Sequence, residues 1–323
     1  MGYCACFMEI INYSKIITKH PWTVKKNQDC ILSPDSDGLL CGLFMTSQLG
    51  WKVRGFYDGK VLLIEKGFKM NDCVFLDMEI FRNDVKSVGQ HMVAYDTEKL
   101  PPNWSNFDNC ISANNIRGFD YKHKFKEKYP LGTIHLLLAI IGSVENIKLK
   151  KSSVGPLFYT DGTFKNLFNY PENCLSWLYF LGAENPKSPL YNLFFNNSYS
   201  VSDLMKELRE IFNSIKLIAD GNRGGDKIKL SNNKGELINF DRNLKKISPG
   251  TKDQAIKFLK FLANKTGWDF VPNNWTWGSL ETIVFVKGSG LKPGKARYNE
   301  LMSKNPLSLA IISSLSIEYT LVK

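Results

Sequence analysis

Aspartates and one histidine follow several predicted strands of this chain, close to the point where each strand ends. They are Asp35, Asp37, Asp77, His91 and Asp161. Carboxylates that face one another at this density repel strongly unless a cation lies between them. Aspartate, histidine and water are suitable ligands for manganese or magnesium, and a bridging carboxylate suits a two-metal centre. Taken alone, Asp35 or Asp37 is more simply a helix N-cap, so the prediction of a metal site depends on the whole set.

A sheet must bring these residues together, and the first 185 residues alternate between strand-like and helix-like segments. We predict strands at 29–33, 51–57, 60–65, 72–77, 87–95 and 154–161, and helices at 38–50, 130–141 and 173–183. This alternation predicts an α/β fold with an open, mostly parallel sheet and helices on both faces. Ligands of such sheets bind beyond the carboxyl ends of the strands, which is where the aspartates stand.

The chain changes character near residue 186, where proline and asparagine cluster. We predict a metal-binding domain over 1–185, a linker over 186–200 and a smaller α+β substrate-binding domain over 201–323. In the last of these the pattern predicts helices at 201–219, with Ser202 as N-cap, and at 251–267. It also predicts strands at 279–288 and 314–322.

Composition indicates a soluble protein with a basic surface. The net charge of +11 favours polyanionic partners such as nucleic acid or nucleotides, and a solvated basic surface explains it equally well. The seven cysteines are scattered without paired metal-binding spacing, which is typical of reduced thiols. The longest apolar run is too short to span a bilayer, and the first residues lack the order of a signal peptide. We therefore expect a cytoplasmic protein without membrane association.

The order of these motifs resembles that of the DHH phosphoesterases over roughly residues 28–185. Their first motif, His-x-Asp-x-Asp-Gly, is similar to "SPDSDG", which keeps Asp35, Asp37 and Gly38. "VFLDMEI" supplies a lone aspartate, "GQHM" stands in place of Asp-His-His, and "YTDG" supplies the downstream aspartate. The resemblance implies that Asp35, Asp37, Asp77, His91 and Asp161 are both the metal ligands and the catalytic set. It also implies one or two manganese or magnesium ions.

This chain departs from the family pattern at three positions. Ser33 stands where the family has a metal-binding histidine, Gln90 replaces the aspartate of the third motif, and Met92 replaces its second histidine. A shift of one residue would instead align Gly89, Gln90 and His91 with that motif. One metal site, formed by Asp37, Asp77, His91 and Asp161, is intact on the first alignment. The Gly-Gly-Gly-His signature of the family's second domain is absent.

Basic residues in flexible segments are the candidates for contacts to substrate phosphate. "KGSGLKPGKAR" places cations around glycines, "GNRGGDK" is a second such segment, and "NNIRGFDYKHKFKEKY" is basic and aromatic. Plain turns and a solvated loop are the alternatives for these segments. The predicted substrate-binding residues are Gln90, Arg117, Arg223, Lys287, Lys292, Lys295 and Arg297.

The sequence therefore leaves two functions open. The first is a manganese- or magnesium-dependent phosphoesterase that hydrolyses a phosphodiester in nucleic acid, a short oligonucleotide or a signalling nucleotide. The second is a catalytically impaired DHH-like protein that binds nucleotide or nucleic acid as a sensor or partner subunit. For either function, a homodimer or a complex with a protein partner is the assembly that we consider. Ser33, Gln90 and Met92 are the residues that favour the second.

Overall fold

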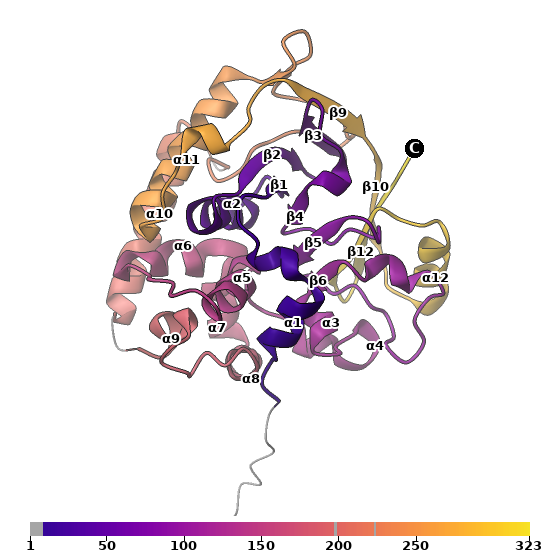
Figure 1. The fold of residues 1–323 in the computed structure, drawn as a ribbon, viewed down its shortest axis with the longest axis horizontal. Coiled ribbons are helices and arrows are strands. Elements are labelled where there is room, and N and C mark those ends of the chain that lie inside the picture. The colour runs from indigo at the N-terminus through magenta and orange to yellow at the C-terminus, as the bar shows by residue number, and fades with distance from the viewer. Residues whose placement is uncertain (1–8, 197–198, 223) are drawn as a thin grey trace, which may run out of the picture.

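A seven-stranded sheet forms the centre of the computed structural model, which describes residues 9–196, 199–222 and 224–323 (Figure 1). Its strand order is β6-β5-β4-β1-β2-β3-β9. β1 lies parallel to β2 and β4, and β4, β5 and β6 continue the parallel part, whereas β3 is antiparallel to both β2 and β9. The strands are β1 (Asp29–Leu32), β2 (Lys52–Tyr57), β3 (Val61–Glu65), β4 (Val74–Leu76), β5 (Lys86–Gly89), β6 (Cys110–Ser112) and β9 (Leu280–Val284). The predicted mostly parallel α/β sheet is thus confirmed.

Helices cover one face of this sheet. α2 (Ser36–Leu49) packs on β1, β2 and β4, and is flanked by α5 (Thr133–Gly142) and α11 (Pro249–Thr266). Outside these lie α6 (Val154–Tyr159), α9 (Pro189–Phe194) and α10 (Val201–Ile218), on the same side of the sheet in Figure 1. α2 ends where the sequence predicts, because Gly50 adopts the left-handed conformation (φ 66°) that terminates helices.

The opposite face of the sheet packs against a second, smaller cluster. Ile31, Tyr57 and Phe75 project from the strands into it, and Phe285 and Leu307 from the end of the chain close over them. Helices are predicted on both faces, but the described residues of this cluster lie in strands, loops and a short 3₁₀ turn. β1 is buried on both faces, which explains why its sequence is a continuous apolar run.

The C-terminal part of the chain adds two small antiparallel sheets and one strand of the main sheet. The larger is β10-β12-β11, made of β10 (Val286–Leu291), β11 (Ser308–Ser313) and β12 (Ser316–Leu321). The smaller pairs β7 (Phe240–Asp241) with β8 (Lys246–Ile247). β9 pairs with β3, so the part after residue 200 also builds the main sheet. The division into domains at 186–200 stays a prediction.

The remaining helices complete the described part of the chain. They are α1 (Tyr13–Lys19), α3 (Ala113–Ile116), α4 (Tyr121–Lys124), α7 (Thr163–Asn169), α8 (Pro171–Phe180) and α12 (Lys295–Ser303). No described helix has both the length and the apolar composition needed to cross a membrane. The described cysteines, Cys30, Cys41, Cys73, Cys110 and Cys174, are buried and free; Cys4 and Cys6 lie outside the described residues.

Several local predictions are wrong. The segment 154–161 is not a strand: Val154, Leu157 and Phe158 are buried at helical spacing in α6, and a short apolar run does not by itself distinguish strand from helix. α10 begins after Ser200 rather than Ser202, since the Ser200 hydroxyl accepts from Asp203 N at 3.1 Å. α5 begins at Thr133 rather than Pro130.

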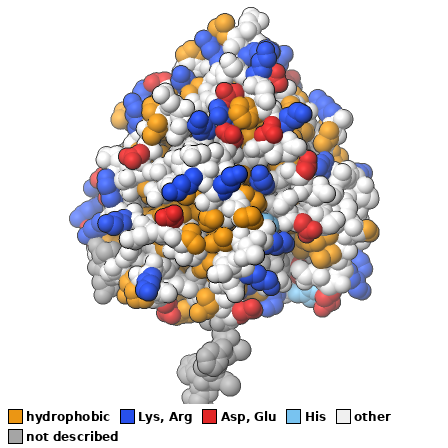
Figure 2. All heavy atoms as spheres, viewed as in Figure 1, with side chains coloured by type: hydrophobic (Ala, Val, Ile, Leu, Met, Phe, Trp, Pro, Cys, Tyr) orange, Lys and Arg blue, Asp and Glu red, His pale blue; other side chains and the backbone are white. Residues whose placement is uncertain are grey.

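Surface charge is mixed on the face that Figure 2 shows. Lys and Arg side chains are spread over it, with Asp and Glu side chains between them. This face therefore presents no continuous basic stripe of the kind that tracks a nucleic-acid backbone. Whether the positive net charge serves binding therefore depends on the charges at the site itself.

Candidate metal and phosphate site

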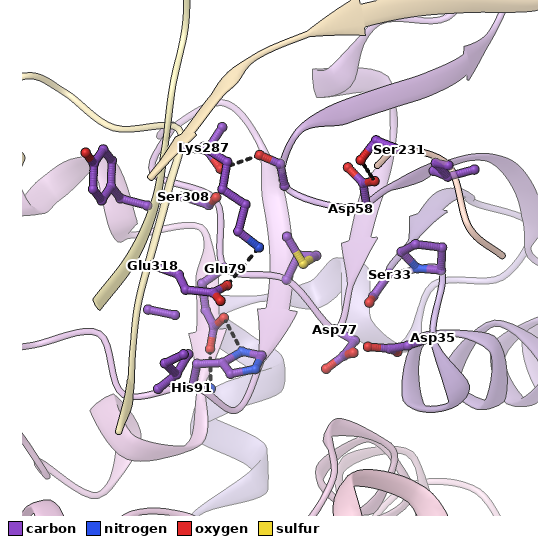
Figure 3. A pocket seen from close by; sticks show the side chains of 18 of the residues that line it. Ser33, Asp35, Asp58, Asp77, Glu79, His91, Ser231, Lys287, Ser308 and Glu318 are labelled. Atoms are coloured by element: carbon purple, nitrogen blue, oxygen red, sulfur yellow. Dashed lines mark hydrogen bonds and ion pairs between the residues drawn. The ribbon is translucent and has the colours of Figure 1, made fainter. Parts of the chain in front are cut away.

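Two adjacent parallel strands carry the first aspartates to one edge of the sheet. β1 ends at Leu32 and β4 at Leu76, and Ser33 N donates to Leu76 O at 3.1 Å. The loops that follow both strands therefore start side by side. A cavity of about 340 Å³ opens at this edge. Figure 3 places Asp35 and Ser33 on one side of the cavity, His91 and Glu79 on the other, and Asp77 between them.

Asp37 is fully buried in the first turn of α2. Its carboxylate accepts two hydrogen bonds from the beginning of α5, from Thr133 N at 2.6 Å and from Ile134 N at 3.2 Å. A helix N-terminus favours negative charge because its first N–H groups lack helical partners. Gly132 makes this approach possible, because a Cβ there would lie 3.0 Å from an Asp37 carboxylate oxygen.

Asp77 and Asp161 both stand in left-handed backbone conformation, with φ of 64° and 48°. Asp77 follows β4 directly, and Thr133 Oγ1 donates to it at 2.7 Å. Asp161 lies in the kinked turn that follows α6, and Gln90 Nε2 donates to its carboxylate. Asp37, Asp77 and Asp161 each offer an oxygen that lies within 4.8 Å of the others. Three of the predicted ligands thus meet, although Asp161 arrives from a helical turn and not from a strand.

Burial is the main cause that raises the pKa of each of these three carboxyl groups. The Asp35 charge further raises the pKa of Asp37, and the hydrogen bonds at the start of α5 oppose the rise. For Asp77 and Asp161 the pKa lies well above the usual range, with the charges of Asp37 and Asp35 adding to burial. Asp161 is exposed as a residue, yet its carboxylate loses water among the others. A divalent cation fits this donor set, because it would compensate the three charges that these carboxylates bring together.

His91 is held by Glu79, a residue that the sequence analysis did not single out. Glu79 accepts from His91 N at 2.6 Å and lies 3.0 Å from His91 Nδ1. Burial alone would lower the pKa of His91, but the Glu79 charge and hydrogen bond raise it to about 9. Gly89 leaves room for this pair, since a Cβ there would lie 2.5 Å from the Glu79 carboxyl carbon.

Ser33 and Asp35 line the same cavity as His91 and Asp77. Asp35 also caps α2, with its carboxylate accepting from Gly38 N at 3.1 Å. Gly38 is required for this tight turn, because a Cβ would lie 2.1 Å from Ser33 O. Asp35 therefore is the helix cap that the simpler interpretation expects and still faces the cavity. Met92 is buried, and its carbonyl pairs with the β11 backbone.

Of the predicted phosphate contacts, Lys287 lies at the cavity, where it pairs with Glu318 at 2.7 Å. Gln90 is nearby, bonded to Asp161. Lys292 and Arg297 are exposed outside the cavity lining, Lys295 lines a separate depression near Lys99, and Arg223 lies outside the described residues.

Arg117 is also distant from the cavity lining. Its guanidinium lies 4.6 Å from the Trp177 ring centre and within 4.9 Å of those of Phe119 and Phe180. It also donates to Ser176 Oγ at 2.8 Å. These are the contacts of a packing residue that stabilises the region around α8. Trp51, Trp177, Trp275, Trp277 and His135 are buried.

Sequence reasoning missed four residues that complete the cavity or its supports: Glu79, Thr133, Lys227 and Lys229. Glu79 stands two residues after Asp77, and that spacing was a usable signal. Thr133 bonds Asp37 and Asp77 together, and the two lysines line the same cavity as Asp35 and Asp77. No local pattern marks these three, because each reaches the site only through folding.

A second acidic group lies elsewhere, formed by Asp96, Glu98 and His123. Lys122 Nζ is 2.8 Å from Asp96, and its charge already compensates that carboxylate. We therefore place no metal there.

No known protein family matches this chain, and neither curated proteins nor solved structures gave a match.

Proposed function

We propose that this protein is a divalent-cation-dependent phosphoesterase that hydrolyses a phosphodiester in a nucleotide or in nucleic acid. The observation that carries the proposal is the meeting of Asp37, Asp77 and Asp161 within 4.8 Å. Carboxylates that crowd together without a cation destabilise a fold, so three of them side by side, with Asp77 at the cavity, support a metal site. Manganese or magnesium is the cation that best fits an oxygen-rich set.

A bound cation supplies the charge that acidifies a water molecule and offsets charge on phosphoryl oxygens. The protein's own residues have separate tasks. Asp37, Asp77 and Asp161 hold the cation, and Thr133 fixes the orientation of the first two. Glu79 orients the His91 ring toward the cavity by holding its Nδ1. Asp35 is the remaining carboxylate for a second cation.

The test is hydrolysis of bis(p-nitrophenyl) phosphate and of short oligonucleotides with manganese, with magnesium and with chelator. We expect turnover that requires the metal and falls at least 100-fold in Asp77→Asn, because one ligand charge is lost while the side chain keeps its shape. Glu98→Gln, in the second acidic group, is the matched control and should retain full activity. Metal-independent turnover, or equal rates in wild type and Asp77→Asn, would contradict the proposal.

A second candidate is a protein that binds a cation and a nucleotide without turnover. It is favoured by the hydrogen bond of the Gln90 amide to Asp161, which occupies a ligand oxygen, and by Ser33 in place of a ligand. The same assay separates the two functions. Metal-dependent nucleotide binding with no hydrolysis in wild type, across diesters and monoesters, would select this candidate.

A further inference from the structure

We propose that Lys227 and Lys229 form a phosphate-binding rim that restricts the cavity to small phosphorylated substrates of about nucleotide size. The inference rests on the proposed function and narrows its substrate class. Both lysines line the cavity that Asp35, Asp77 and His91 also line. They lie two residues apart, on either side of buried Ile228, and both are exposed.

The backbone that carries the rim is fixed to the acidic loops. Ile228 N donates to Pro34 O at 2.8 Å, between Ser33 and Asp35, and Ile228 is itself buried. One residue before the rim, buried Asp226 accepts from Tyr159 Oη at 2.7 Å, two residues before Asp161 in the chain. The rim is thereby joined to the loop that carries Asp35 and to the end of α6, just before Asp161, with about 190 residues of chain between Pro34 and Ile228.

A third attachment lies beyond the rim, where Ser231 Oγ donates to Asp58 at 2.5 Å (Figure 3). An extended segment held at several points loses little freedom when a ligand binds, which favours affinity. This geometry is that of a prepared binding surface and not of a mobile tail.

The two ammonium groups have no ion-pair partner among the described residues, in contrast to Lys287, which pairs with Glu318 at 2.7 Å. Two lysines without an ion pair therefore line a cavity that Asp35, Asp77 and Glu79 also line. An anion between a cation bound to the aspartates and the rim would satisfy both sides at once. Phosphoryl oxygens suit this position, since lysine binds them as a point charge.

The size of the cavity limits the ligand. About 340 Å³ lies near the lower end of the range for small-molecule sites. A ligand with one or two phosphoryl groups fits such a space. The mixed charge on the face in Figure 2 gives no extended basic track for a long strand.

Binding of inorganic phosphate with magnesium, measured by calorimetry, tests the rim without requiring turnover. We expect the double variant Lys227→Gln/Lys229→Gln to bind phosphate at least about tenfold more weakly, because charge-assisted hydrogen bonds are lost. Lys227→Arg/Lys229→Arg should retain binding, and Lys292→Gln/Lys295→Gln, outside the cavity lining, should match wild type. Unfolding temperatures should be equal in all four proteins.

Hydrolysis separates failure of the rim from failure of the proposed function. With an active wild type, the glutamine double variant should lose at least about tenfold in kcat/KM for a small diester. Unchanged phosphate affinity and unchanged kcat/KM would overturn the rim and leave the phosphoesterase standing. An inert wild type that binds phosphate through these lysines would support the rim and overturn the phosphoesterase. Tighter metal binding with unchanged phosphate binding would mean that the lysines only balance the acidic charge, and would also overturn the rim.

Discussion

Replacing Asp77 by asparagine should stabilise the metal-free protein and remove its response to metal. Asparagine tolerates the left-handed backbone at this position (φ 64°) and can still accept from Thr133 Oγ1. The change therefore removes a charge and leaves the shape intact. Two ionised carboxylates within 4.8 Å of each other repel by at least about 3.5 kcal/mol at an effective dielectric constant of about 20. Proton uptake limits this penalty, so we expect a gain of about 2–3 kcal/mol.

The sign of the pH dependence follows from the raised pKa of Asp77. The folded protein holds a proton that the unfolded chain releases above about pH 4, so the stability of the metal-free wild type falls as pH rises from there. The decline ends only above the folded-state pKa, and each unit of separation amounts to about 1.4 kcal/mol. Asp77→Asn should show a flatter decline, and its advantage should grow from pH 5 to pH 8.

Thermal unfolding in chelator and in manganese measures both effects. For a chain of this length, unfolding as one cooperative unit, 1 kcal/mol corresponds to about 1.5 °C, so Asp77→Asn should unfold about 3–5 °C above wild type in chelator at pH 8. Manganese at 100 times its dissociation constant should raise the wild type by about 4 °C and leave the variant unchanged. In manganese the two proteins should then unfold at about the same temperature, or the wild type should unfold at the higher one.

Asp120→Asn is the matched control with the opposite sign. Asp120 is also buried, but hydrogen bonds from Thr97 and His123 outweigh burial and lower its pKa. Its replacement should destabilise the protein at pH 8 in chelator and in manganese alike. The reasoning is refuted if Asp77→Asn unfolds below wild type in chelator, or if manganese stabilises it as strongly as wild type.

Three further predictions concern single contacts. Gly132→Ala should weaken manganese binding at least tenfold in a calorimetric titration, because its Cβ would lie 2.9 Å from Thr160 and 3.0 Å from Asp37. Gly250→Ala is the control: nothing lies close to its Cβ, so it should bind manganese as the wild type does. Glu79→Gln should lower the pKa of His91 from about 9 toward 6.5 in an NMR titration, since the Glu79 charge and hydrogen bond hold it up; an unchanged pKa would contradict that origin. Arg117→Met should lower the free energy of unfolding by about 1–3 kcal/mol in chemical denaturation, because Arg117 contacts aromatic rings. Its phosphate affinity should not change. A loss of phosphate binding at unchanged stability would show instead that Arg117 contacts the substrate.

The raised pKa of His91 also predicts that the folded protein loses stability at high pH. Its folded-state value exceeds the unfolded one, so the stabilisation from the protonated His91–Glu79 pair is complete below about pH 6.5. It is lost as pH rises through about 9. The pH dependence of unfolding of Glu79→Gln in chelator should lack this second decline, whereas wild type should show it.

Local sequence determined the part of the site that β1, β4 and α2 supply. β1 and β4 are short apolar runs followed by aspartates, and α2 is bounded by an Asp35 cap and a terminal Gly50. These features depend on residues a few positions apart, where periodicity, capping and burial act directly. Strand order was also accessible in outline, because alternating strands and helices favour parallel neighbours whose carboxyl ends share an edge.

Tertiary structure alone decided how the site is completed. Asp161 was predicted at a strand end, yet the segment before it is the buried helix α6, and Asp161 itself stands in a left-handed turn. Lys227 and Lys229 reach the cavity through one backbone hydrogen bond to Pro34 and the packing of Ile228. Contacts across some 190 residues leave no local signal, because their energy arises only when distant segments exclude water together. The sequence by itself therefore determined which carboxylates this protein brings to its sheet edge, and only the fold decided which lysine side chains line the cavity with them.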